Sequence, residues 1–264
     1  MKLIALDMDG TLLGSDRAIS KRNMEAIRKA ERQGIYVILA TGRMYRSAKE
    51  YSYLSTSDMP VIAYNGGLIR EFNDGRILFQ QNMPKELVAP TFDLAKGYGL
   101  GANFYIDDNL YGNEGNPYIA GYAEYIGVPY EIIPDRELHR TISEGDIMKM
   151  VAMGPAERID HFLKDHISEM GRQLYLAKSW PGFLEIAHKE TNKGLALKSL
   201  GEILGIRPEE MMAIGDNLHD HEMLEYVGYP VIMANGHEYL LDKHYYRTKT
   251  NDEDGVAHAI SQFI

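Results

Sequence analysis

The chain has 264 residues, 45% of them hydrophobic, which predicts a globular protein of one large or two modest domains rather than a disordered one. The formal net charge of −10 argues against a general nucleic-acid binder, which would show a basic patch. The sequence holds no cysteine, which excludes disulfides, thiolate catalysis and cysteine zinc sites. No apolar run approaches the length of a membrane span, and we expect a cytoplasmic protein without a signal peptide.

The first 80 residues alternate strand and helix signals. Three continuous apolar runs are typical of strands buried in a parallel sheet, at residues 3–6, 35–40 and 61–64. A helix between the first two runs begins at the N-cap Ser20 and ends at Gly34. After the third run, Asn65-Gly66-Gly67 turns the chain, and a hairpin is predicted over residues 68–70 and 77–79.

The character of the sequence changes near Pro84, where helix and hairpin signals follow one another in mixed order. Predicted helices cover residues 84–98, 117–126 and 155–170, and predicted strands cover 102–106, 110–111, 147–153, 173–177 and 183–187. Parallel-type alternation resumes after Lys193, with strands at 211–214 and 231–233 and helices at 193–204 and from about 219 and 252. We therefore predict an α/β fold, a doubly wound parallel (Rossmann-like) domain of residues 1–81 and 189–264 that an α+β domain interrupts at 82–188.

The most informative motif is Asp7-Met8-Asp9-Gly10-Thr11, which directly follows the first predicted strand. Open α/β sheets place their ligand sites at the carboxyl ends of strands, where both carboxylates lie. Asp7 is suited to be a nucleophile and metal ligand, and Asp9 to give a proton to a leaving group and take one from water. Turn acids and a calcium loop are the ordinary alternatives. The calcium loop fails because its twelfth position, which needs Glu, is Ala18.

Two further polar clusters in the predicted α/β domain suit a phosphate group. In Thr41-Gly42-Arg43, a hydroxyl and backbone N–H groups at a helix start fit a phosphate oxygen, although Thr41 is equally well explained as an N-cap. Lys193 also stands at a helix start, where the helix dipole disfavours a cation. A buried anion or an aspartyl phosphate would offset that cost, whereas a solvated surface lysine is the simpler alternative.

A fourth cluster, Gly215-Asp216-Asn217-Leu218-His219-Asp220, follows the predicted strand at 211–214. Asp216 and Asp220 lie four residues apart across a strand-to-helix turn, and with Asp7 they would form a hard, all-oxygen site suited to Mg²⁺. Two capping aspartates are the simpler interpretation of this segment alone. The four clusters together are far more specific than any one of them.

In the order and spacing of these motifs, the whole chain resembles the haloacid dehalogenase (HAD) superfamily phosphatases of the Cof type, subfamily IIB, in which a C2B cap follows the third strand. The resemblance is carried by Asp7-Met8-Asp9-Gly10-Thr11-Leu12-Leu13, Thr41-Gly42-Arg43, Asn65-Gly66-Gly67, Glu185-Ile186, Lys193-Gly194, Gly215-Asp216-Asn217 with Asp220 and Met223-Leu224, and Asp254-Gly255-Val256-Ala257. It implies a HAD core at 1–81 and 189–264, a substrate-specificity cap at 82–188, and a Mg²⁺-dependent phosphatase that forms an aspartyl phosphate.

The resemblance also implies a role for each site residue. Asp7 is the nucleophile, Asp9 is the general acid and base, and Lys193 binds the phosphoryl group together with Thr41. The implied metal ligands are Asp7, the backbone carbonyl of Asp9, Asp216 and, in support, Asp220. The other positions expected at the phosphate or substrate are Gly42, Arg43, Asn65, Asn217 and His219.

One position departs from the family pattern, because His219 stands where the family usually has Asn. An imidazole still donates a hydrogen bond, but it is bulkier and titrates near neutral pH. Besides a phosphatase, two functions stay open. One is a phosphotransferase or phosphomutase that acts on a sugar, and the other is a protein that binds phosphorylated ligands with impaired catalysis.

The expected partner is a small phosphorylated metabolite, and neither a nucleic acid nor a membrane. Sugar phosphates, a flavin-pathway phosphate and pyridoxal phosphate are all compatible with the sequence. Tyrosines are numerous in the predicted cap, and they would either stack on a sugar or a ring or serve as ordinary core and surface residues. They are Tyr98, Tyr105, Tyr111, Tyr118, Tyr122 and Tyr125.

Overall fold

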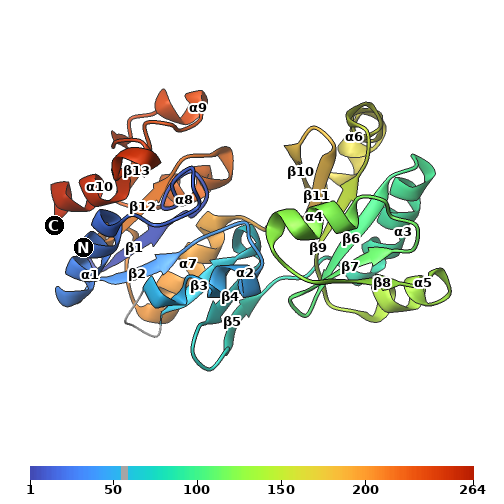
Figure 1. The fold of residues 1–264 in the computed structure, drawn as a ribbon, viewed down its shortest axis with the longest axis horizontal. Coiled ribbons are helices and arrows are strands. Elements are labelled where there is room, and N and C mark those ends of the chain that lie inside the picture. The colour runs from blue at the N-terminus through green and yellow to red at the C-terminus, as the bar shows by residue number, and fades with distance from the viewer. Residues whose placement is uncertain (55–58) are drawn as a thin grey trace. The chain divides into compact units, whose positions relative to one another are not determined.

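The computed structural model describes residues 1–54 and 59–264, which form two compact units (Figure 1). Unit 1 comprises Met1–Gln80 and Asn192–Ile264, and unit 2 comprises Gln81–Thr191. In the colours of Figure 1, unit 1 therefore runs from blue to cyan and again from orange to red, and unit 2 lies between them in the chain.

Unit 1 is built on a five-stranded sheet in the order β14-β13-β12-β1-β2, in which every neighbouring pair is parallel. Its strands are β1 (Leu3–Leu6), β2 (Tyr36–Leu39), β12 (Met211–Gly215), β13 (Tyr229–Ile232) and β14 (Tyr246–Arg247). The chain leaves β1 toward β2 on one side and returns to β12 on the other, so β1 lies at a switch point in the strand order. Open α/β sheets bind their ligands at such a point, outside the carboxyl ends of the strands.

Helices cover both faces of this sheet, as a doubly wound fold requires. The helices of unit 1 are α1 (Lys21–Arg32), α2 (Tyr45–Lys49), α7 (Lys193–Leu204), α8 (His221–Tyr226), α9 (Glu238–Leu241) and α10 (Gly255–Phe263). Leu3 and Ala5 pack in one core with α7 and α8. Leu6 points to the opposite face, where it meets Ile27 of α1, because side chains alternate along a strand. The predicted Ser20 N-cap of α1 is confirmed, since its side chain accepts a hydrogen bond from Asn23 N.

The third predicted strand is not part of the five-stranded parallel sheet. A separate antiparallel sheet holds β3 (Pro60–Ala63), β4 (Leu68–Glu71) and β5 (Ile77–Gln80). A single parallel bridge, Ala40 to Ile62, links β3 to the chain just beyond β2. The left-handed backbone at Tyr64 and Asn65 reverses the chain at once, so β3 pairs mainly with β4, the next strand along the chain.

Unit 2 is an α+β unit around a six-stranded sheet in the order β10-β11-β9-β6-β7-β8, antiparallel except for the pair β7 and β8. Its strands are β6 (Gly101–Ile106), β7 (Asn109–Asn113), β8 (Tyr130–Ile133), β9 (Ile147–Met153), β10 (Leu174–Trp180) and β11 (Phe183–His188). Its helices are α3 (Lys85–Gly97), α4 (Ile119–Ile126), α5 (Asp135–Glu144) and α6 (Ala156–Met170). We did not predict β8 and α5 from the sequence.

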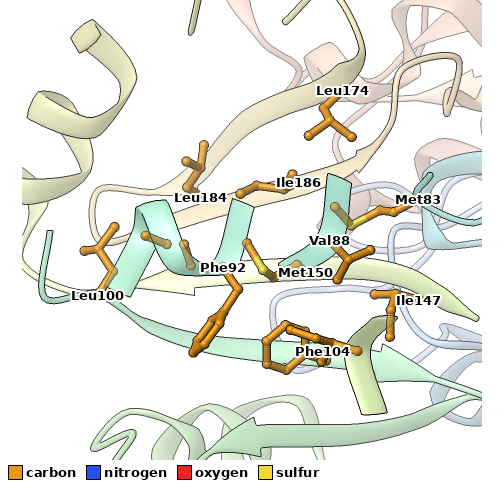
Figure 2. Close-up of a cluster of buried hydrophobic side chains, with 14 of the residues drawn as sticks. Met83, Val88, Phe92, Leu100, Phe104, Ile147, Met150, Leu174, Leu184 and Ile186 are labelled. Carbon is orange, nitrogen blue, oxygen red and sulfur yellow. The ribbon is translucent and has the colours of Figure 1, made fainter. Parts of the chain in front are cut away.

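The core of unit 2 lies on one face of its sheet, as Figure 2 shows. Val88 and Phe92 of α3 meet Phe104 and Met150 of the central strands there. By alternation, the neighbour Lys149 projects from the opposite face of the sheet. Over residues 1–54 and 59–264, no helix has the length and apolar character needed to cross a membrane.

Candidate active site

The first and the fourth predicted clusters meet because the strands that precede them, β1 and β12, are neighbours. Asp7 directly follows β1, and its backbone N–H donates to the carbonyl of Ile214 in β12 at 3.0 Å. Leu6 and Ile214 are register partners, so Asp7 and Asp216 leave the sheet at the same edge. Strand pairing alone thus places carboxylates from residues more than 200 positions apart next to one another.

Lys193 lies at the centre of the site and is buried. Its ammonium Nζ donates to Asp7 Oδ1 and to Asp220 Oδ1, each at 2.6 Å. Asp7, Asp216 and Asp220, which we call the acidic cluster, place one carboxylate oxygen each within 4.8 Å of one another. The predicted nucleophile, the predicted phosphate cation and two predicted metal-site acids therefore lie together.

The acidic cluster carries more negative charge than Lys193 can balance. Burial, and then the neighbouring Asp220 carboxylate, raises the pKa of Asp7 well above its usual value. The same two causes raise the pKa of Asp216 to about 6. Burial alone would lower the pKa of Lys193, but Asp220 and Asp7 outweigh it, and the pKa lies above its ordinary value. Three carboxylates that lie close together beside one ammonium fit a further cation, and oxygen donors suit Mg²⁺.

Gly10 and Thr11 fit closely around Asp216. Thr11 Oγ1 donates to Asp216 Oδ1 at 3.0 Å. Gly10 has a left-handed backbone (φ 83°), and a Cβ there would lie 2.4 Å from Asp216 Oδ2. The glycine of the motif is therefore needed so that the loop after β1 can approach the Asp216 carboxylate. Asn235, which we did not predict, holds the same loop by donating from Nδ2 to the Gly10 carbonyl at 2.8 Å.

Besides its contact with Lys193, Asp220 also accepts hydrogen bonds from the loop that follows β12. Its Oδ2 accepts hydrogen bonds from the N–H groups of Asp216 at 2.9 Å and of Asn217 at 3.0 Å. The exposed Asn217 side chain accepts from Leu218 N at 2.7 Å and so caps the short turn that follows. His219 lies half-buried in that turn, directly before Asp220.

Asp9 differs from Asp7 in being exposed, with 57% of its side chain accessible. The Arg43 guanidinium donates two hydrogen bonds to the Asp9 carboxylate, from Nε to Oδ2 at 2.7 Å and from Nη2 to Oδ1 at 2.5 Å. Arg43 also donates to the Tyr51 hydroxyl at 3.4 Å. We expected Arg43 at the phosphate or substrate and did not predict its pairing with Asp9, because 34 residues separate the two.

Thr41 and Asn65 lie next to each other just beyond β2, the strand on the other side of β1. Thr41 follows β2, the other neighbour of β1, and its Oγ1 accepts from Arg43 N at 3.1 Å. Asn65 N donates to the Thr41 carbonyl at 2.9 Å, and a Cβ on Gly42 would lie 2.8 Å from Asn65 Oδ1. A Cβ on Gly66 would lie 2.2 Å from the Asn192 carbonyl, so this turn packs against the start of α7.

Comparison with known proteins identifies the family. The pattern of the haloacid dehalogenase-like hydrolases matches residues 4–260. The chain is 30% identical over 269 aligned residues to the protein YxeH of Bacillus subtilis, and the alignment covers 100% of this chain and 98% of that protein. It is 30% identical over 289 residues to the 5-amino-6-(5-phospho-D-ribitylamino)uracil phosphatase YwtE of the same organism, with 100% and 98% covered.

Solved structures agree. TM0651 of Thermotoga maritima superposes with a TM-score of 0.89 at 29% identity and covers 99% of this chain and 97% of its own. A haloacid dehalogenase-like hydrolase of Bacteroides thetaiotaomicron gives 0.88 at 29% identity, with 100% and 99% covered. The resemblance and the fold class are confirmed. The chain belongs to the haloacid dehalogenase-like hydrolase family, and it is a phosphatase of that family.

Proposed function

We propose that this chain is a Mg²⁺-dependent phosphatase that hydrolyses small phosphorylated metabolites through a phosphoaspartate at Asp7. The observation that carries the proposal is the contact of the buried Lys193 with both Asp7 and Asp220 at 2.6 Å, beside the third carboxylate of the acidic cluster. Phosphoryl transfer depends on positioning and charge stabilisation, and this arrangement supplies both.

Asp7 is the proposed nucleophile. Its Oδ1 is engaged by Lys193, which orients the carboxylate and leaves Oδ2 for attack on phosphorus. Attack forms the bond from the Asp7 oxygen to phosphorus while the bond from phosphorus to the ester oxygen breaks, and the charge that builds on the phosphoryl oxygens lies near the Lys193 ammonium. Thr41 and the adjacent N–H groups at the neighbouring strand end are the proposed further donors to those oxygens.

Asp9 is the proposed general acid and base, and Arg43 positions it. The Asp9 carboxylate is far more exposed than that of Asp7, so it is accessible to a leaving group and to water. The two hydrogen bonds from Arg43 occupy both carboxylate oxygens of Asp9, so proton transfer through Asp9 requires this pair to loosen. An incoming phosphate dianion competes for the same guanidinium, which links substrate binding to the release of Asp9.

The proposed metal ligands are Asp7, Asp216 and the backbone carbonyl of Asp9. When bound, Mg²⁺ would neutralise phosphate charge and orient the phosphate for in-line transfer. Asp220 is a supporting residue in this proposal, because its two oxygens already accept hydrogen bonds from Lys193 and from two backbone N–H groups. Asn65, Gly42, Asn217 and His219 remain proposed contacts to phosphate or substrate.

The proposed substrate is a small phosphomonoester such as a sugar phosphate. YwtE, at 30% identity, is named for a phosphate on a ribityl chain that is joined to a uracil ring. YitU of the same organism, at 26% identity, carries the same activity in its name. We propose unit 2, the insertion predicted at 82–188, as the domain that selects among such compounds.

The test is a screen of phosphorylated metabolites for phosphate release with Mg²⁺, run in parallel with Asp7→Asn. We expect release by the wild type and a loss of at least about a hundredfold in the variant, because the amide keeps the shape but loses the nucleophilic charge. Asp74→Asn, an exposed acid of the β4–β5 turn, is the matched control and is expected to be fully active. Wild-type activity in Asp7→Asn would contradict the proposal.

A further inference from the structure

The turn at residues 233–237, directly after β13, is joined through its backbone to the loop after β12. The N–H group of Met233 donates to the Gly215 carbonyl at 3.0 Å, and the N–H group of His237 donates to the Asp216 carbonyl at 2.8 Å. Both bonds join main-chain atoms, so they do not depend on a side-chain rotamer. The turn is therefore fixed relative to the backbone that carries Asp216.

Asn235 and Asn251, which we call the asparagine pair, join this turn to the loop after β1. Asn235 Nδ2 donates to the Gly10 carbonyl at 2.8 Å, and Asn235 Oδ1 accepts from the Asn251 N–H at 3.0 Å. Asn251 Nδ2 in turn donates to the Leu13 carbonyl at 2.9 Å. The asparagine pair thus holds two carbonyls of the loop that also carries Asp9.

The hydrogen bond from Asn235 acts one residue beyond Asp9, at a glycine. Gly10 has a left-handed backbone (φ 83°) and no side chain, and glycine is the residue whose backbone dihedral angles are least restricted. The N–H of the peptide group after Gly10 reaches the Met8 carbonyl only at 3.4 Å, whereas its oxygen accepts from Asn235 at 2.8 Å. The Asp9 side chain is 57% exposed, so packing does not fix it. The shorter of the two bonds, from Asn235, is therefore the stronger restraint on this peptide group.

We propose that Asn235 and Asn251 are positioning residues for the phosphatase reaction, because they hold the loop from which Asp9 reaches the leaving group. The inference rests on the proposed role of Asp9 as general acid and base. Arg43 orients the Asp9 carboxylate, whereas the asparagine pair fixes the backbone to which that carboxylate is attached. Asn235 is exposed, so shortening it removes its hydrogen bonds without opening a buried cavity, and the free energy of unfolding should change little.

The first experiment measures the order of this loop without turnover. The N–H groups of Leu12 and Leu13 donate to the Met8 carbonyl at 3.1 and 2.9 Å, so their hydrogen exchange reports how often the loop after β1 opens. In the Mg²⁺-free protein we expect exchange at both positions to be about tenfold faster in Asn235→Ala and in Asn251→Ala, with the urea unfolding curve unchanged. Exchange at the wild-type rate in both variants would overturn the proposal.

Asn109→Ala is the matched control. Asn109 Nδ2 donates to the Asp107 carbonyl at 2.9 Å, a bond of the same kind as that from Asn235 but in unit 2. We expect this variant to match the wild type in hydrogen exchange of the loop after β1 and in activity. An equal effect of Asn109→Ala and Asn235→Ala would overturn the proposal, because the effect would then not depend on contact with that loop.

The second experiment joins the asparagine pair to the reaction through the leaving group. An alkoxide needs a proton from Asp9 in order to leave, whereas 4-nitrophenolate is stable enough to leave without one. The two substrates are 4-nitrophenyl phosphate and the alkyl phosphomonoester that the metabolite screen shows to be hydrolysed fastest. We expect Asn235→Ala to lower kcat/KM about tenfold for the alkyl ester and no more than about twofold for the aryl ester. Equal losses on the two esters would overturn the proposal, because a merely structural role lowers the amount of active enzyme for both.

Asn235→Asp tests which atom of the side chain acts. It keeps the size and the oxygen that accepts from Asn251, but an ionised carboxylate has no hydrogen to donate to the Gly10 carbonyl. We therefore expect the loss on the alkyl ester to be at least as large as in Asn235→Ala, and wild-type kinetics in Asn235→Asp would overturn the positioning role. Wild-type activity in Asp7→Asn would instead contradict the proposed function and leave the hydrogen-exchange result standing, so the two failures differ.

Discussion

Asp216→Asn tests whether the ionised carboxylates of the acidic cluster lower the free energy of unfolding when no metal is bound. Burial and Asp220 raise the pKa of Asp216 from 3.8 to about 6, so the folded state binds this proton more tightly than the unfolded state. The ionised carboxylate therefore destabilises the fold, and the penalty is absent well below pH 4 and complete above the folded pKa. A shift of about two units corresponds to about 3 kcal/mol, an upper value for a group that retains some exposure.

The asparagine keeps the shape and the acceptor oxygen for Thr11 but removes the charge. In EDTA at pH 8, we expect Asp216→Asn to unfold at higher urea concentration and to gain about 1–3 kcal/mol in the free energy of unfolding. At pH 4 the gain should shrink to about 0.5 kcal/mol, because little of the penalty remains there. Saturating Mg²⁺ should then stabilise the wild type at pH 8 and leave the variant nearly unchanged.

Urea unfolding curves at the two pH values, with and without Mg²⁺, measure all of these quantities. A variant that is less stable than the wild type at pH 8 would refute the electrostatic reasoning. A gain of the same size at both pH values would also refute it, because a packing effect does not follow the titration of a carboxylate.

Three further predictions follow from the site. Gly66→Ala should lower the free energy of unfolding in urea by more than about 2 kcal/mol, because its φ of +102° disfavours a side chain and a Cβ would lie 2.2 Å from the Asn192 carbonyl. Gly97→Ala is the control, since a Cβ there meets nothing within 4 Å, and it should be neutral or stabilising in the same urea unfolding experiment. Arg43→Met should lower kcat by about tenfold or more, because Asp9 loses the group that positions it, whereas Tyr51→Phe should change kcat little; equal effects would contradict a positioning role for Arg43. Activity lost in EDTA should return better with Mg²⁺ than with Ca²⁺, which takes longer bonds and more ligands, and full activity after exhaustive chelation would rule out the metal.

The parallel sheet, and the emergence of Asp7 and Asp216 at its edge, were predictable because a buried strand and the residue that follows it can be recognised from local sequence. A short apolar run that ends in Asp7 predicts both a buried strand and where its carboxylate emerges, and strand pairing then brings Asp7 to Asp216. The contacts of Lys193 with Asp7 and Asp220 also depend on the pairing of β1 with β12, because the two acids follow these strands. In contrast, the pairing of Arg43 with the exposed Asp9 depends on the reach of a long side chain, which no spacing encodes.

Three predictions about the fold were wrong or missing, and each has a physical reason. Residues 61–64 have the composition of a parallel strand, but the left-handed turn at Tyr64 and Asn65 gives β3 an antiparallel partner. The strand β8 is exposed at three of its four positions and lacks a continuous apolar run. The helix α5 had a readable signal that we missed, because Leu138 and Ile142 are buried four residues apart on one face.

The central claim is that Asp7 carries the phosphoryl group during turnover, and chemical trapping measures this directly. Enzyme mixed with a substrate found in the screen is quenched within one turnover and reduced with borohydride, which converts an acyl phosphate to an alcohol and so turns a phosphoaspartate into homoserine. We predict homoserine at position 7 in the wild type, and none in Asp7→Asn or in wild type quenched without substrate. Rapid turnover with position 7 unmodified, or with the trapped group on another residue, would contradict the account.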